Sequence, residues 1–296
     1  MSLASLNLAK KTKQDEFYTK LITIEHELQY YTHLLKDKII FCNCDDPLKS
    51  NFFKYFHSNF DKLCLKKLIC VGYRENQRGI FCEVLSSKDK LSIKYLEGDG
   101  SFSSTESINY LIEADIVITN PPFSLLNPYM DKLNQYNKKY LIIGNMNAIT
   151  YKKILPMLIN KNLWGGVTSH SKTDRNYFEF TFPEGYKVKD VRTENGIPYA
   201  RLSFIRWWTN LEYDFNARPQ LELTCSYKGN EHLYSHYHSV GAINVDEIKL
   251  IPQDYKDIMG VPITFLDKYR PDKHEIVGYI NPPNKYKRLL IKIKEY

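Results

Sequence analysis

Four short, almost wholly apolar runs in the first half of the chain constrain its fold more than any other feature. They are Lys38–Cys42, Leu68–Val71, Asp115–Thr119 and Tyr140–Gly144. Stretches with apolar residues at helical spacing, such as Asn51–Phe56, lie between them. A strand without polar alternation is buried on both faces, and helical connections allow neighbouring strands to run parallel. The sequence therefore predicts an α/β fold with a mostly parallel central sheet covered on both faces.

The remaining pattern divides the chain into two expected regions. Pro47 suits the first turn of a helix, and Ile80–Leu85 with Leu91–Leu96 favours a hairpin. After Trp164 the pattern becomes antiparallel, with strands expected at Tyr177–Phe182 and Ala200–Trp208. From Leu211 onward the periodicity is weak and proline is frequent. We therefore expect a larger α/β domain over residues 1–210 and a smaller, irregular region over residues 211–296.

The segment with the clearest chemistry is the strand 115–119 running directly into Asn120, Pro121, Pro122 and Phe123. Ligands bind at the carboxyl ends of strands in an open parallel sheet. The asparagine oxygen and a backbone carbonyl freed by the prolines offer two acceptors for the hydrogens of an exocyclic amine. The nitrogen lone pair is then free to attack an electrophile, and the Phe123 ring can stack on the base that carries the amine. The pattern indicates alkylation of a planar amine.

The same three residues can also be a plain turn, because Asn-Pro dipeptides mark turns. The chain contains a second copy, Asn281-Pro282-Pro283-Asn284, which also follows an apolar stretch. Its fourth residue is not aromatic and it lies near the end of the chain. We interpret the second copy as a turn and residues 120–123 as the catalytic segment.

Further segments extend the argument beyond this tetrapeptide. They are Asp15-Glu16-Phe17-Tyr18-Thr19, Cys42-Asn43-Cys44-Asp45-Asp46-Pro47, Glu97-Gly98-Asp99 and Gly260–Tyr269. With these segments the chain resembles the gamma-ordered amino-methyltransferases, and most closely the EcoRI-type adenine-specific DNA methyltransferases. The resemblance implies a Rossmann-like fold, S-adenosylmethionine as cofactor and methyl transfer to the 6-amino group of an adenine flipped out of duplex DNA.

The resemblance also implies roles for individual residues. Residues 17–19 match the motif that folds over the methionine end of the cofactor, and residues 45–47 match the motif whose carboxylate holds its amino group. Asp99 matches the acceptor for the amine of the cofactor's adenine. The expected cofactor-binding residues are Phe17, Tyr18, Thr19, Asp45, Asp46, Pro47 and Asp99.

Two segments depart from the usual family pattern. The family has a glycine-rich loop after Asp-Pro, whereas Leu48-Lys49-Ser50-Asn51 contains no glycine. The second strand of the family ends in an acidic residue for the ribose, but Val71-Gly72-Tyr73 has none, and Glu75 is the nearest candidate. The wall of the pocket must therefore be built differently here, and the ribose partner stays open.

The charge distribution favours a polyanionic partner. The chain carries a net charge of +7, and most of the excess lies within residues 111–210. A basic face of this kind suits DNA phosphates. The expected DNA contacts are Lys172, Arg175, Lys187, Lys189 and Arg192.

The sequence also argues against a membrane span, a secretory signal and a metal site. No apolar run is long enough to span a bilayer, no secretory signal is visible, and the six scattered cysteines suit free thiols in the cytoplasm. The spacing of His232, His236 and His238 fits neither one helix face nor one strand face, so no metal site is expected.

We expect a monomer that serves either in restriction–modification, with a separate cognate restriction endonuclease, or as a solitary modification enzyme. Two alternatives stay open at this point. An RNA or protein-amide N-methyltransferase can share the Asn-Pro-Pro-aromatic segment. A catalytically idle nucleic-acid-binding protein could keep the same fold.

Overall fold

The computed structural model describes residues 18–88, 90–168, 178–182, 191–202, 204–283 and 286–294. The chain forms two compact units. The first combines Met1–Asn145 with His170–Tyr213, and the second combines Met146–Ser169 with Asp214–Tyr296. The last passage of the chain from the first unit to the second, after Tyr213, lies three residues beyond the boundary expected at 210/211. Residues 146–169, which we expected in the first domain, group with the C-terminal region instead.

Packing within the second unit explains this grouping. The Trp164 ring lies edge-on against Phe215, with 5.6 Å between ring centroids. The Arg218 guanidinium donates to the Gly165 carbonyl at 2.6 Å and to the Leu266 carbonyl at 2.6 Å. These contacts connect the segment 146–169 to partners more than fifty positions later in the sequence.

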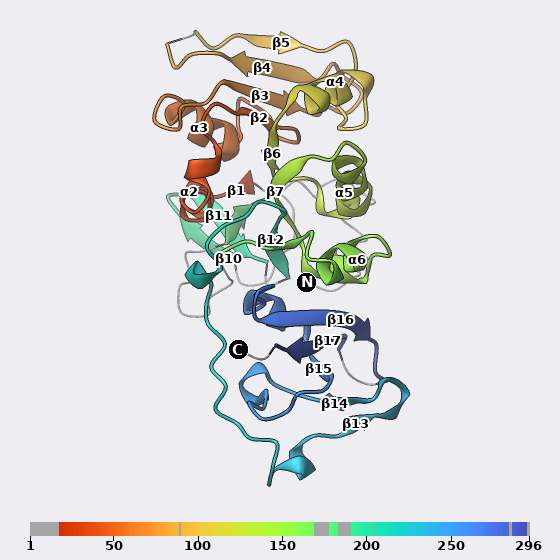
Figure 1. Ribbon diagram of the computed structural model, residues 1–296. Helices are drawn as coiled ribbons and strands as arrows, with labels where there is room; N and C mark the ends of the chain where they lie inside the picture. Colours follow the sequence, from red (N-terminus) through yellow and green to blue (C-terminus); the bar gives the residue numbers. More distant parts are fainter. Residues whose placement is uncertain are drawn as a thin grey trace. The chain divides into compact units, whose positions relative to one another are not determined.

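A mixed sheet forms the core of the first unit (Figure 1). Its strands lie in the order β5-β4-β3-β2-β6-β7-β12. Their bounds are β2 Ile39–Cys42, β3 Lys67–Gly72, β4 Ile80–Val84, β5 Ile93–Tyr95, β6 Ile116–Thr119, β7 Lys139–Asn145 and β12 Ile205–Thr209. The four apolar runs of the sequence are thus confirmed as neighbouring strands β3, β2, β6 and β7.

The expectation of a mostly parallel sheet is not confirmed. Strands β3, β2, β6 and β7 run parallel, whereas β4, β5 and β12 pair antiparallel. The connection between β3 and β4, residues 73–79, is shorter than the dozen or so residues that a parallel crossover needs. The hairpin expected from residues 80–96 is present as β4 and β5.

Helices of the first unit lie on both sides of the parallel strands (Figure 1). They are α2 Leu21–Leu28, α3 Asn51–Ser58, α4 Thr105–Glu113 and α5 Leu126–Gln135. Helix α3 does not open at Pro47 as expected. It begins at Asn51, because the Ser50 hydroxyl accepts from the amides of Phe52 at 3.0 Å and Phe53 at 3.3 Å.

A second, small antiparallel sheet belongs to the same unit. Its order is β1-β9-β11-β10, with β1 Tyr18–Thr19, β9 Glu179–Thr181, β11 Ile197–Arg201 and β10 Val191–Glu194. The strand expected at Tyr177–Phe182 is confirmed in its described part. The single strand expected over Ala200–Trp208 is wrong, because residue 200 pairs with β9 while β12 pairs with β7 in the larger sheet.

The second unit is more regular than its proline content suggested. Its strands lie in the order β13-β14-β15-β17-β16 and bury Ile243, Val261 and Ile291 completely. Their bounds are β13 His236–Tyr237, β14 Ala242–Asn244, β15 Met259–Pro262, β16 His274–Ile280 and β17 Arg288–Ile293; α6 Ile154–Ile159 and β8 Trp164–Gly165 also belong to this unit. The second Asn-Pro-Pro copy follows β16, in the connection to β17, as expected for a turn.

In the described part of the chain, no helix is both long and apolar enough to cross a membrane.

Candidate active site

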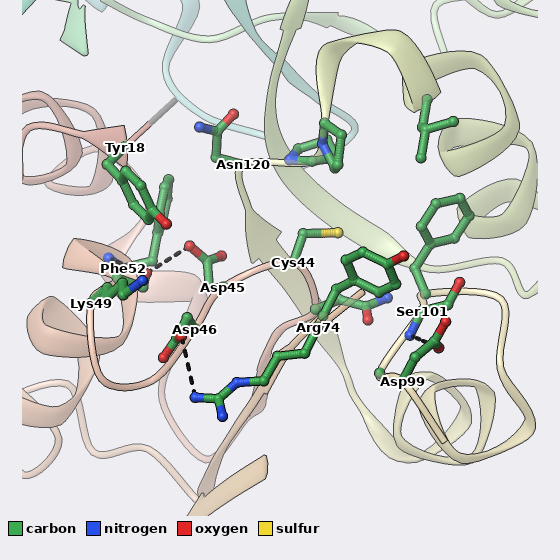
Figure 2. Close-up of a pocket in the computed structure, with 18 of the residues that line it drawn as sticks. Tyr18, Cys44, Asp45, Asp46, Lys49, Phe52, Arg74, Asp99, Ser101 and Asn120 are labelled. Atoms are coloured by element: carbon green, nitrogen blue, oxygen red, sulfur yellow. Dashed lines mark hydrogen bonds and ion pairs between the residues drawn. The ribbon is translucent and has the colours of Figure 1, made fainter. Parts of the chain in front are cut away.

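A cavity of about 710 Å³ lies in the first unit, where β2, β3 and β6 end (Figure 2). Its walls come from β1, from the loops after these three strands and from the loop 99–102. Most of the residues predicted from the sequence line it, namely Tyr18, Thr19, Asp45, Asp46, Asp99, Asn120, Pro121 and Pro122. Pro47 and Phe123 do not line it, and Phe17 lies outside the described residues.

Asp45 joins two walls of this cavity. Its buried carboxylate accepts hydrogen bonds from the Ser50 hydroxyl at 2.6 Å, from the Thr119 hydroxyl and from the backbone amide of Asn120. The Thr119 hydroxyl in turn accepts from the Cys44 amide at 3.0 Å. Burial raises the pKa of Asp45 to about 6, although these hydrogen bonds favour the ionised form. One carboxylate therefore fixes the loop after β2 to the start of the Asn-Pro-Pro segment.

Asp46 faces the cavity beside Asp45 and is only partly covered. One carboxylate oxygen accepts from the Leu48 amide at 2.8 Å, and the other lies 3.9 Å from the guanidinium of Arg74. Figure 2 shows Arg74 reaching from the loop after β3 toward Asp46. Unlike Asp45, Asp46 therefore keeps part of its carboxylate accessible from the cavity.

Asp99 lies on the other side of the cavity from Asp46 (Figure 2). Its carboxylate accepts from the Ser101 amide at 2.9 Å, and its carbonyl accepts from the Arg74 amide at 2.9 Å. Gly100 adopts a positive φ of 79°, and a Cβ there would lie 2.7 Å from the Gly72 carbonyl oxygen. The close approach of these two loops therefore requires glycine at position 100.

The Asn-Pro-Pro-Phe segment leaves β6 at Asn120, which lines the cavity. The Pro122 carbonyl accepts from the Leu125 amide at 2.9 Å, so this carbonyl already has a donor. Phe123 is only 5% exposed, and its ring lies edge-on against Phe180 of β9 at 6.1 Å. The structure thus places Asn120 and both prolines at the cavity but does not place the Phe123 ring on its surface. The stacking role of Phe123 stays a prediction.

Several lining residues were not singled out by the sequence argument. Asn43 follows β2 directly, is 2% exposed, and has a buried side-chain oxygen without a hydrogen-bond partner among the described residues. Glu75, noted earlier as the nearest acidic residue after β3, also lines the cavity, as do Lys49 and Arg74. The one available signal for these residues was their position just after an apolar strand.

The structure describes one of the five basic residues expected to contact DNA. The Arg192 guanidinium lies 2.7 Å from the Glu179 carboxylate and 3.0 Å from that of Glu194. Lys20 joins the same two glutamates at 3.2 and 2.7 Å, which ties β10 to the start of α2. Lys172, Arg175, Lys187 and Lys189 lie outside the described residues.

Comparison with known proteins decides the family. The sequence matches the family described as "Adenine-specific methyltransferase EcoRI" over residues 5–295. The chain belongs to this family. It is therefore an adenine-specific methyltransferase, and its residues 120–123 carry the Asn-Pro-Pro-Phe segment at the cavity found above.

Three curated relatives extend the match over almost the entire chain. Type II methyltransferase M.EcoRI of Escherichia coli is 42% identical, covering 98% of this chain and 96% of the relative. M.MgeORF184P of Mycoplasma genitalium is 39% identical and M.MpnI of Mycoplasma pneumoniae is 35% identical; each match covers 94% of this chain and 86% of the relative. No solved structure gave a significant match. The EcoRI methyltransferase family thus includes this chain over both of its units.

Proposed function

We propose that the protein is a Rossmann-like enzyme that transfers a methyl group from S-adenosylmethionine to the 6-amino group of adenine in duplex DNA. The observation that carries this proposal is the convergence of Asp46, Asp99 and Asn120 on one cavity at the ends of parallel strands. Ligands of open α/β sheets bind at this position. The relatives named as Type II methyltransferases support a role in restriction–modification, with a separate cognate endonuclease. The enzyme would act as a monomer in the cytoplasm, where the free thiols of its six cysteines persist.

The residues present fit the proposed cofactor. A volume of about 710 Å³ lies in the range of sites for molecules of this size. The buried Asn43 oxygen offers an acceptor in this wall, and Asp46 suits an α-amino group. Asp99 would accept from the adenine amine, and Glu75 is the candidate for the ribose hydroxyls. When bound, S-adenosylmethionine supplies an electrophilic methyl group on a sulfonium centre.

The residues of the chain would orient and activate the target amine. The Asn120 side-chain oxygen and a backbone carbonyl at Asn120 or Pro121 would accept its two hydrogens, because the Pro122 carbonyl is already occupied. These acceptors stabilise the positive charge that grows on the nitrogen as it attacks. The adenine must leave the base stack to reach them. Phe123 would hold the extruded base only after its ring separates from Phe180.

A transfer assay tests the proposed substrate. Labelled S-adenosylmethionine would be offered with duplex DNA, RNA and protein in parallel, followed by sequencing of methylated positions in the DNA. We expect label on 6-methyladenine in duplex DNA. Label on RNA or on protein amides would contradict the proposal, and cofactor binding without turnover on any substrate would indicate an idle binding protein.

Replacing Asp99 by alanine should weaken cofactor binding and leave DNA binding nearly unchanged. A hydrogen bond to a carboxylate contributes about 1.5–3 kcal/mol, so cofactor affinity should fall about ten- to a hundredfold. Calorimetry with S-adenosylmethionine and a separate DNA titration measure the two effects. Unaltered cofactor affinity would contradict the role given to Asp99.

DNA binding should weaken steeply with salt, because lysine and arginine release counterions from the phosphates. The logarithm of affinity should fall by about 0.9 per neutralised phosphate for each unit in the logarithm of salt concentration. Reversing Lys172 and Lys187 to glutamate should flatten this slope without changing cofactor affinity. Arg192 is a poor choice for this test, because its loss would also remove one of the two cations, with Lys20, that pair with Glu179 and Glu194. An unchanged slope would place the DNA-binding face elsewhere.

A further inference from the structure

Residues 48–51 contain no glycine, and Lys49 among them brings a cation to the cavity. The Lys49 amide donates to the Asp46 carbonyl at 3.0 Å, which closes a tight turn between the two residues. The hydroxyl of Ser50 turns inward to Asp45, and the Asn51 side chain donates to the Thr19 carbonyl at 2.7 Å. The two residues that follow Lys49 are thus fixed, and Lys49 itself lines the cavity (Figure 2).

The charges at this end of the cavity are complementary to an amino-acid zwitterion. Asp46 offers a carboxylate, and the turn places Lys49 beside it. Arg74 is the other cation that lines the cavity, but its guanidinium is directed to Asp46 at 3.9 Å. Within the described residues, the ammonium of Lys49 makes no hydrogen bond or ion pair. Lys49 is therefore the cation here that can bind an anionic ligand without giving up a partner.

We propose that the Lys49 ammonium binds the α-carboxylate at the methionine end of S-adenosylmethionine, while Asp46 takes the α-amino group. This assignment rests on the cofactor proposed above. A glycine-rich loop can bring backbone amides close to a ligand, whereas a loop without glycine keeps its backbone at a greater distance. A long side chain with a terminal charge spans that distance. The Tyr18–Thr19 strand, bonded to Asn51, forms the neighbouring wall.

Decarboxylated S-adenosylmethionine lacks the group that Lys49 would bind, so it provides a direct test. Calorimetry on the full-length protein would measure both ligands with the wild type, Lys49→Met and Lys49→Arg. We expect Lys49→Met to weaken S-adenosylmethionine about tenfold, as expected for loss of a charge-assisted contact on a half-open site. It should leave the affinity for the decarboxylated compound unchanged. Lys49→Arg should retain most of the affinity for the intact cofactor.

Lys54→Met is the matched control, because Lys54 is exposed on α3 and does not line the cavity. This variant should bind both ligands as the wild type does. If Lys49→Met binds the intact cofactor normally, or loses equal affinity for both ligands, the role of Lys49 is wrong and the proposed cofactor stands. If the wild type binds neither compound, the proposed cofactor and the role of Lys49 are overturned together.

Discussion

Replacing Asn120 by alanine should lower turnover about a hundredfold while cofactor binding is preserved. Asn120 stands at the end of β6, a strand that is buried along its whole length, so its side chain is delivered to the cavity by a rigid element. Loss of one preorganised hydrogen bond that strengthens in the transition state costs about 3 kcal/mol, which corresponds to this factor. Single-turnover methylation and cofactor calorimetry measure the two quantities separately.

The chain carries its own control for this experiment. Asn281 begins the second Asn-Pro-Pro copy and is exposed after β16. The variant Asn281→Ala should methylate at the wild-type rate. Near-normal turnover of Asn120→Ala, or an equal loss in both variants, would remove Asn120 from the mechanism.

Replacing Asp45 by asparagine should change how the stability of the cofactor-free protein depends on pH. The pKa of Asp45 is about 6 in the folded state and about 3.8 when the chain is unfolded. Between these values the folded state holds the proton more tightly, so the free energy of unfolding falls as pH rises. The difference of about two pKa units corresponds to a loss of about 3 kcal/mol in the free energy of unfolding. This loss is complete above pH 7 and absent below pH 3.

The variant Asp45→Asn has no carboxyl proton to lose, so its free energy of unfolding should not show this fall. From acidic to neutral pH, its stability relative to the wild type should therefore rise by about 3 kcal/mol. Chemical denaturation across this range measures the gain. The control is Glu97→Gln, whose side chain is 93% exposed; its curve should stay parallel to that of the wild type. If the free energy of unfolding of Asp45→Asn runs parallel to that of the wild type across this pH range, ionisation of the buried carboxylate does not destabilise the folded state.

The sequence was sufficient to predict the four parallel strands of the large sheet. Runs such as Ile39–Cys42 and Ile116–Ile118 are apolar because both faces are buried, and this pattern is visible without a structure. Asn120 was expected at the carboxyl end of such a strand, whereas Asp46 and Asp99 were expected from the family resemblance; the structure places all three at one cavity. The strand direction of β4 and β12 depends on connection length and tertiary pairing, which the apolar pattern does not encode.

The remaining site features depend on contacts between distant segments. The sequence shows that Phe123 follows two prolines, but the burial of its ring depends on contact with Phe180 of β9. Likewise, Arg192 forms an ion pair with Glu179 because the fold brings β9 to it. The segment 146–169 joins the second unit through Trp164 and Gly165, whose partners lie after residue 213. No local pattern predicts such partners.

The pairing of β1 with β9 has a consequence for how the enzyme is made. Tyr18 lies opposite Thr181, and Thr19 lies opposite Phe180, so one wall of the cavity joins β1 to a strand translated about 160 residues later. Strand β12, which extends the large sheet, follows later still. Before residues 179–181 are synthesised, the chain can form the parallel strands, but β1 has no partner. Translation must therefore pass β9 before this wall of the cavity can close.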